Sequence, residues 1–101
     1  MIDLDSKYVS EVKRILRRHL PHCEVLAYGS RVSGSARRYS DLDLAIISDK
    51  RLDWRVLDDL RDAFAQSDLP IIIDAVDWNT LTPQLRRLIE RDSELIQRPE
   101  P

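Results

Sequence analysis

The sequence is poor in the residues on which several common classes of protein depend. One cysteine in 101 residues excludes an internal disulfide and a four-cysteine zinc site. No apolar run approaches the roughly 18 residues of a membrane-spanning helix, and the first residues lack the basic and apolar regions of a signal peptide. We therefore expect a cytoplasmic protein that does not cross a membrane.

The chain is also short and nearly balanced in charge. Residues 1–101 fit a single small domain, which can bury a modest core but not a deep, enclosed substrate cavity. The net charge of −2 argues against a nucleic acid as partner. Lysine occurs only at Lys7, Lys13 and Lys50, so arginine supplies the other 13 of the 16 basic residues. Arginine suits paired contacts to carboxylates or phosphates.

Helical periodicity and short β-prone runs alternate along the chain. Helices are expected at residues 6–20, 53–66 and 83–91, and strands at residues 23–28, 41–47 and 70–78. Ser6 is the expected cap of the first helix, Thr82 that of the last, and residues 99–101 are expected to be frayed. This order predicts an α/β fold in which a three-stranded mixed sheet carries flanking helices.

The two glycines of the chain, Gly29 and Gly34, lie within one six-residue stretch. Gly29 follows an expected strand, where a glycine adopts a positive φ or lets a phosphate approach the backbone. A short helix that opens at Ser30 would point its first N–H groups at that phosphate. Arg31 either adds positive charge to this contact or is an ordinary surface cation. The stretch predicts a phosphate-binding loop.

A pair of aspartates follows this loop after a ten-residue spacer. Asp41 and Asp43 are two residues apart on an expected strand, so both carboxylates project from the same face. Two like charges at this distance repel, and carboxylates together with substrate phosphates are the usual ligands of Mg²⁺. The pair alone also suits the solvated start of a strand. In combination with the glycine loop it predicts a metal site.

The third expected strand offers one further acid to this pair. Asp74 and Asp77 are three residues apart, so they lie on opposite faces and only one can join Asp41 and Asp43. Asp74 interrupts an apolar run, which favours it as the third carboxylate. Asp77 is expected at the solvated end of the strand. The sequence leaves the choice between Asp74 and Asp77 open.

These motifs resemble the minimal nucleotidyltransferase (MNT) branch of the DNA polymerase β-like superfamily. The resemblance rests on Gly29-Ser30, the ten-residue spacer, Asp41-x-Asp43 and the later strand acid, and it covers roughly residues 8–97. It implies a polymerase β-like core in a single domain, residues 1–101. Larger members of the superfamily carry further domains that grip the base or the acceptor.

The resemblance implies a nucleotidyltransferase with ATP as nucleotide donor and two Mg²⁺ ions. Attack on the α-phosphate would release pyrophosphate. The catalytic and metal-binding residues would be Asp41, Asp43 and Asp74, and the nucleotide-binding residues would be Gly29, Ser30 and Arg31.

The resemblance also implies a partner protein. Such proteins commonly pair with a helical HEPT-domain protein, and several act as antitoxins that transfer AMP onto a tyrosine of that toxin. We therefore expect a hetero-oligomer with a HEPT-type toxin. The alternative is a weakly active or inactive nucleotide-binding antitoxin or regulatory subunit, which neutralises its partner by complex formation. A third hypothesis is a subunit of an enzyme that modifies a small molecule or a nucleic acid.

Overall fold

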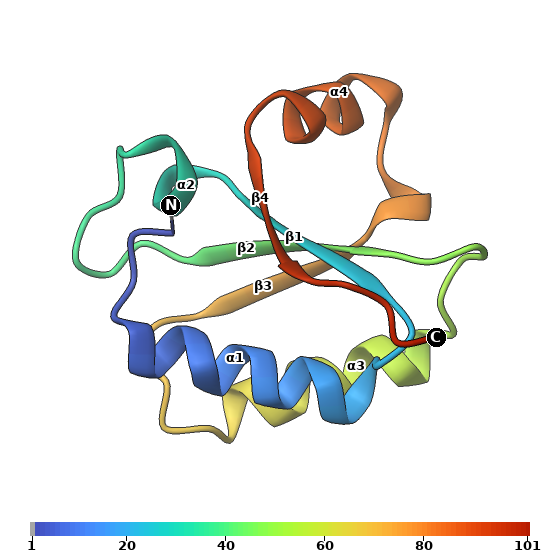
Figure 1. Ribbon diagram of the computed structural model, residues 1–101, viewed down its shortest axis with the longest axis horizontal. Coiled ribbons are helices and arrows are strands. Elements are labelled where there is room, and N and C mark those ends of the chain that lie inside the picture. Colours follow the sequence, from blue (N-terminus) through green and yellow to red (C-terminus); the bar gives the residue numbers. More distant parts are fainter. Residues whose placement is uncertain (1) are drawn as a thin grey trace.

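A four-stranded mixed sheet organises the chain in the computed structural model, which describes residues 2–101 (Figure 1). The strands stand in the order β3-β2-β1-β4, and β1 pairs antiparallel with both of its neighbours, whereas β2 and β3 run parallel. The strands are β1 (Glu24–Tyr28), β2 (Leu42–Ile47), β3 (Ile73–Asp77) and β4 (Ser93–Gln97).

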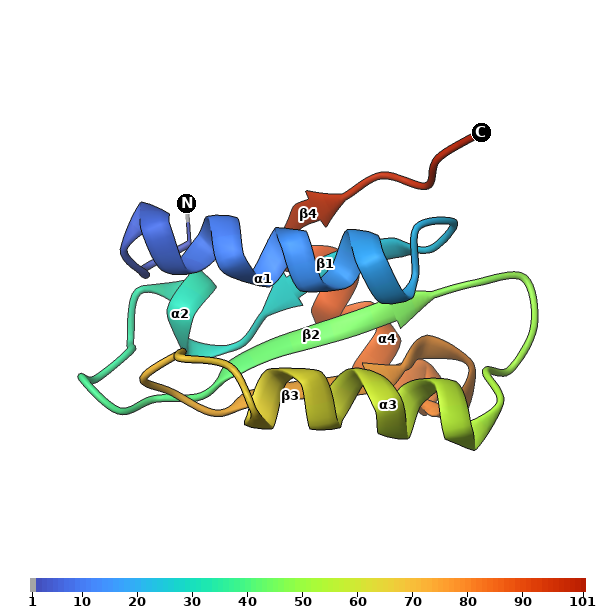
Figure 2. The same cartoon turned by 90° about the horizontal axis from the view of Figure 1, so that it is seen from below.

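Helices cover both faces of this sheet. One face carries α1 (Ser6–His19) and α3 (Trp54–Ala65), and the opposite face carries α4 (Pro83–Arg91) (Figures 1 and 2). The four-residue helix α2 (Ser30–Ser33) directly follows β1, and the 3₁₀ turn η1 (Trp78–Thr80) follows β3. Within residues 2–101, none of the helices has both the length and the hydrophobicity needed to cross a membrane.

The core lies between the sheet and the helices α1 and α3. Leu42, Leu44 and Ile46 of β2 are fully buried there, together with Val12 of α1 and Leu60 of α3. Burial of such a side chain contributes roughly 1.5–3 kcal/mol. Because side chains alternate along a strand, the residues between these three point to the face that carries α4. The α/β class and the mixed sheet are confirmed.

The prediction of three strands is wrong, because the C-terminal residues add β4 to the edge of β1. Only Leu95 and Ile96 are apolar within this five-residue strand, so its local pattern is weak. Gln97 is buried, and its Nε2 donates hydrogen bonds to the carbonyls of Leu20 (2.8 Å) and Cys23 (2.9 Å). Long-range main-chain pairing and this amide, rather than local periodicity, hold the strand.

Two further local predictions need correction. The cap of α1 is Asp5, whose carboxylate accepts a hydrogen bond from the amide of Lys7 at 3.0 Å, and not the neighbouring Ser6. The tail is also held, because the amide of Glu100 donates to the carbonyl of Pro21 at 2.8 Å. The start of α4 agrees with the sequence analysis, since Thr82 caps it and Pro83 occupies its first turn.

Candidate active site

Three strands bring Tyr28, Asp43 and Asp74 into one row across the sheet. Tyr28 of β1 pairs with Asp43 of β2, and Asp43 pairs with Asp74 of β3. Adjacent strands lie about 4.7–4.9 Å apart, so these side chains are neighbours on the face that carries α4. Asp41 lies just before the start of β2, and its charge acts on Asp43. The fold therefore gathers the three predicted carboxylates at one end of the sheet.

Negative charge accumulates in this row. Burial raises the pKa of Asp43 above its ordinary value, and the charges of Asp74 and Asp41 raise it further. Burial, together with the charges of Asp43 and Asp74, raises the pKa of Tyr28 to about 12. Each shift reports a site that disfavours additional negative charge and would favour a nearby cation.

The donor chemistry of the row fits Mg²⁺ when a substrate supplies the remaining ligands. Within residues 2–101, no three His, Cys, Asp or Glu side chains form a ready metal-binding group. Proteins usually hold Mg²⁺ through only one or two carboxylates, with water and substrate phosphates as the other ligands. The carboxylates of Asp41 and Asp43 match this arrangement.

Gly29 lies directly against the Asp43 carboxylate. Its φ is +82°, and a Cβ added there would collide with Oδ2 of Asp43 and lie 3.3 Å from Cγ. Helix α2 starts at the next residue, Ser30, and Gly34 ends it with a φ of +90°. The predicted strand–glycine–short-helix arrangement is therefore present, and its glycine lets the main chain approach the acids.

Arg31 forms hydrogen bonds with the main chain of the loop that precedes the acids. Its side chain is buried, and the guanidinium donates hydrogen bonds to the carbonyls of Asp3 (2.6 Å), Ser40 (2.8 Å) and Arg38 (3.2 Å). The interpretation of Arg31 as an ordinary surface cation is thus wrong. Because Ser40 immediately precedes Asp41, these bonds fix the main chain at the start of the acid pair. A direct contact between Arg31 and a nucleotide stays a prediction.

The geometry separates Asp74 from Asp77. Asp77 is only 3% exposed, and its two carboxylate oxygens accept hydrogen bonds from the amides of Leu52 (2.9 Å) and Asn79 (3.0 Å). The expectation of a solvated strand end at Asp77 is therefore wrong. Asp74 is exposed and paired in register with Asp43, so it is the acid that β3 brings to the row.

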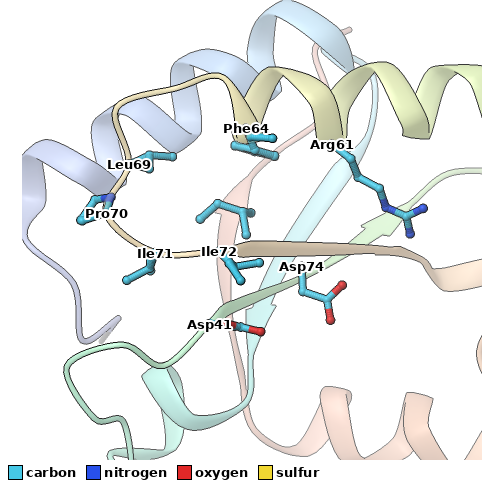
Figure 3. A pocket seen from close by; sticks show the side chains of 10 residues that line it. Asp41, Arg61, Phe64, Leu69, Pro70, Ile71, Ile72 and Asp74 are labelled. Atoms are coloured by element: carbon cyan, nitrogen blue, oxygen red, sulfur yellow. The ribbon is translucent and has the colours of Figure 1, made fainter.

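A cavity of about 570 Å³ adjoins Asp41 and Asp74 at the β3 edge of the sheet (Figure 3). The segment that leads into β3 forms much of its wall, and Ile72 in that segment is 68% exposed. Arg61 also lines it and donates hydrogen bonds to the carbonyl of Ala75 at 2.8 and 3.2 Å. The row of acids thus opens onto a partly apolar cavity, which no local pattern in the sequence locates.

Comparison with known proteins identifies the family. A sequence profile of the family described as "Polymerase beta, Nucleotidyltransferase" matches residues 10–100. The chain belongs to this family. It is 44% identical over 99 residues to the probable protein adenylyltransferase MntA of Haemophilus influenzae, a match that covers 98% of this chain and 87% of that relative. The nucleotidyltransferase class and the resemblance to MNT proteins are therefore confirmed.

Solved structures share the fold. A crystal structure of a mutant of the toxin–antitoxin MntA-HpeT superposes with a TM-score of 0.75 at 20% identity, over 91% of this chain and 74% of the other. A toxin–antitoxin structure with AMP-PNP superposes with a TM-score of 0.67 at 23% identity, also over 91% of this chain and 74% of the other. A structure of a tri-AMPylated Shewanella oneidensis HEPN toxin in complex with MNT antitoxin superposes with a TM-score of 0.62 at 20% identity. This match covers 94% of this chain and 73% of the other. At these identities the likeness supports the polymerase β-like fold of this nucleotidyltransferase.

Proposed function

We propose that this nucleotidyltransferase transfers AMP from ATP to a tyrosine hydroxyl of a helical HEPT-type toxin and thereby acts as its antitoxin, in the cytoplasm. The observation that carries the proposal is the row of Asp43 and Asp74 with Gly29 against it. The proposal is supported by the 44% identical relative, which is named a probable protein adenylyltransferase. It is also supported by structural neighbours that are toxin–antitoxin complexes, one with AMP-PNP and one with a tri-AMPylated toxin.

In this proposal the three aspartates bind the metal ions, and the glycine loop binds the phosphates. Asp41 and Asp43 supply oxygen ligands for two Mg²⁺ ions, and Asp74 completes the second set. Bound Mg²⁺ offsets the charge of the phosphates and lowers the pKa of an attacking hydroxyl. Gly29 and the first amides of α2 bind the β- and γ-phosphates, because the absence of a Cβ at Gly29 lets the main chain approach the Asp43 carboxylate and so brings these amides next to the acids.

The transfer step then takes place next to Asp74, where the acceptor tyrosine binds. The tyrosine oxygen attacks the α-phosphorus of ATP, a new oxygen–phosphorus bond forms, and the bond to the leaving pyrophosphate breaks. Asp74 accepts or orients the proton of the attacking hydroxyl. It lies on β3, at the edge of the sheet, so an acceptor approaches from that edge. The cavity beside Asp74 provides an apolar wall for the acceptor ring.

Mass spectrometry of the complex tests this proposal. The chain is co-purified with its HEPT-type partner and incubated with ATP and Mg²⁺, and the intact mass of the partner is measured. We expect added AMP units with the wild-type chain and none with Asp43→Asn. Asp58→Asn is the matched control, because Asp58 is exposed on α3, on the opposite face of the sheet, and should leave the transfer intact. An unmodified partner after incubation with the wild-type chain would contradict the proposal.

Neutralisation by complex formation alone is the second candidate. Exposed apolar side chains around the site favour a binding role, since Tyr39 is 75% exposed and Ile72 is 68% exposed. Under this candidate, an Asp41→Asn, Asp43→Asn double variant still protects cells from the toxin. If protection is lost while the complex still forms, catalysis rather than occlusion neutralises the toxin.

A further inference from the structure

The turn that leads into the acids presents a tyrosine to solvent. Residues 37–40 form a tight turn, in which the last amide donates a hydrogen bond to the first carbonyl at 3.0 Å. Tyr39 lies at the tip of this turn and is 75% exposed. The three tyrosines of the chain all lie within the described residues 2–101. Among them Tyr39 alone is exposed, whereas Tyr8 and Tyr28 are partly buried.

The turn is held in place by the buried side chain of Arg31. Its guanidinium donates hydrogen bonds to the carbonyls of Arg38 (3.2 Å) and Ser40 (2.8 Å), which are the residues on either side of Tyr39. The guanidinium of Arg38 lies 5.4 Å from the centre of the Tyr39 ring. The tyrosine is therefore displayed from a fixed main chain, which lowers the ordering cost of binding it elsewhere, and it has a positive group beside its ring.

Tyr39 lies on the same edge of the molecule as the cavity proposed for the acceptor. Pro70 and Ile71 line that cavity, which contains Asp41 and Asp74, and they also line a cavity of about 300 Å³ that contains Tyr39. The two cavities therefore share a wall, and Tyr39 lies across this wall from the acids of its own chain. Because its side chain is largely exposed, it is free to enter the acceptor cavity of another molecule.

We propose that Tyr39 is itself an AMP acceptor, and that one copy of the chain transfers AMP from ATP onto Tyr39 of a second copy. The inference rests on the proposed function, which places an acceptor tyrosine in the cavity beside Asp74. Tyr39 and that cavity lie on the same edge. Two copies that meet through this edge with two-fold symmetry therefore place each Tyr39 at the cavity of the other copy.

The transfer step balances in the same way as the reaction on the toxin. The hydroxyl oxygen of Tyr39 attacks the α-phosphorus of ATP, and a new oxygen–phosphorus bond forms. The bond from the α-phosphorus to the bridging oxygen breaks, and pyrophosphate leaves with the electron pair. The phenolic proton passes to Asp74 of the copy that binds ATP. The phosphodiester left on Tyr39 carries a negative charge, which the guanidinium of Arg38 beside the ring offsets.

Mass spectrometry of the full chain without toxin tests this inference. An isotope-labelled Asp43→Asn chain, which cannot catalyse transfer, is mixed with unlabelled wild type, ATP and Mg²⁺, so that AMP on the heavy chain reports transfer between copies. Peptide mapping should find this AMP on Tyr39. Tyr39→Phe in the heavy chain should abolish it. Tyr8→Phe is the matched control and should retain it, because Tyr8 lines the same cavity as Tyr39 but is partly buried.

The possible failures are distinguishable when the same wild-type preparation is also incubated with the toxin. If the toxin gains AMP and neither copy of the chain does, Tyr39 is not an acceptor while the proposed function stands. If neither the toxin nor the chain gains AMP, the proposed function fails and this inference fails with it. AMP on another residue, or on the unlabelled wild-type chain alone, would also overturn transfer onto Tyr39 between copies.

Discussion

Asp43 and Asp74 occupy directly paired positions on the parallel strands β2 and β3. The charge of Asp74 adds to burial in raising the pKa of Asp43, so the fold holds two carboxylates together at a penalty to its own stability. Because the two carboxylates repel each other in the free protein, the site is suited to a positively charged ligand that relieves this repulsion.

Asp43→Asn should stabilise the free protein while it abolishes transfer. Because the pKa of Asp43 is raised on folding, the folded state retains this proton more tightly than the unfolded chain. Stability is therefore lost as the pH rises from about 4, the ordinary value, through the raised pKa. The variant lacks this loss. About 1 kcal/mol shifts the Tm of a domain of this size by roughly 4–8 °C.

Thermal unfolding followed by circular dichroism measures this effect. At neutral pH the Tm of Asp43→Asn should exceed that of the wild type by a few degrees, and the difference should vanish below about pH 4. Asp58→Asn serves as the control and should match the wild type at both pH values. A lower Tm for Asp43→Asn at neutral pH would contradict the electrostatic argument.

The two glycines should tolerate alanine differently. Both have positive φ, so each alanine is expected to destabilise the fold. The cost is about 1–2 kcal/mol at Gly34, which is left-handed, and larger at Gly29, whose φ of +82° and ψ of −157° suit glycine alone. A Cβ at Gly29 collides with Asp43, whereas a Cβ at Gly34 meets nothing within 4 Å. Gly29→Ala should therefore lose AMP transfer, and Gly34→Ala should keep it within about twofold at a temperature where both are folded. Equal activity of the two variants would show that the close approach at Gly29 is not required.

Arg31→Ala should mainly lower the stability of the fold. The substitution leaves the carbonyls of Asp3 and Ser40 without their buried charged donor, which we expect to lower the free energy of unfolding by about 2–3 kcal/mol. Urea denaturation measures this loss, and Arg37→Ala in the same loop, where the side chain is exposed, is the control. Unchanged stability together with weaker tripolyphosphate binding would instead assign Arg31 to a direct phosphate contact.

Substitutions of Asp74 and Asp77 should have different effects, the first on AMP transfer and the second on stability. Asp74→Asn is expected to slow AMP transfer at least about 100-fold, because it removes the proton-accepting carboxylate. It should not lower stability, because it also removes a charge that repels Asp43. Asp77→Ala should lower the free energy of unfolding by about 2 kcal/mol, because the amides of Leu52 and Asn79 lose their acceptors. Transfer assays on the folded protein and urea denaturation give the two readouts. The reverse pattern would exchange the roles of the two residues.

Ile72→Ala should impair the acceptor side of the reaction alone. The side chain is largely exposed beside Asp74, so its truncation should change stability by less than about 0.5 kcal/mol. We expect transfer to the partner to fall about tenfold, equivalent to about 1.4 kcal/mol, with AMP-PNP affinity unchanged. Val56→Ala, on α3 at 37% exposure, provides the control. A loss of nucleotide affinity in Ile72→Ala would place the donor, not the acceptor, in this cavity.

The parts of the fold that follow from local periodicity were predictable. Alternation along β2 placed Asp43 on the face opposite the leucines, and helical spacing located α1, α3 and α4. The position of Gly29 between a strand and a short helix also followed from the sequence. These features depend on neighbours within a few residues of each other.

The parts that were missed depend on distant partners. Strand β4 is defined by pairing with β1, and Gln97 reaches carbonyls more than 70 residues away along the chain. Arg31 and Asp77 are charged side chains buried by hydrogen bonds to the main chain of other segments, and no local pattern marks them. The pairing of Asp43 with Asp74 is a matter of strand register, which the three-residue spacing of Asp74 and Asp77 did not determine.

The pairing of β4 with β1 also decides where a reporter group can be attached. Ser93 lies beside Tyr28 at the acid end of β1, whereas Gln97 pairs with Val25 near the other end. From there the chain continues to Glu100, which is fastened to Pro21 after α1. A fluorophore or affinity tag joined after Pro101 would therefore lie toward the opposite end of β1 from the acids, so surface immobilisation through this residue should leave the acids accessible to a nucleotide.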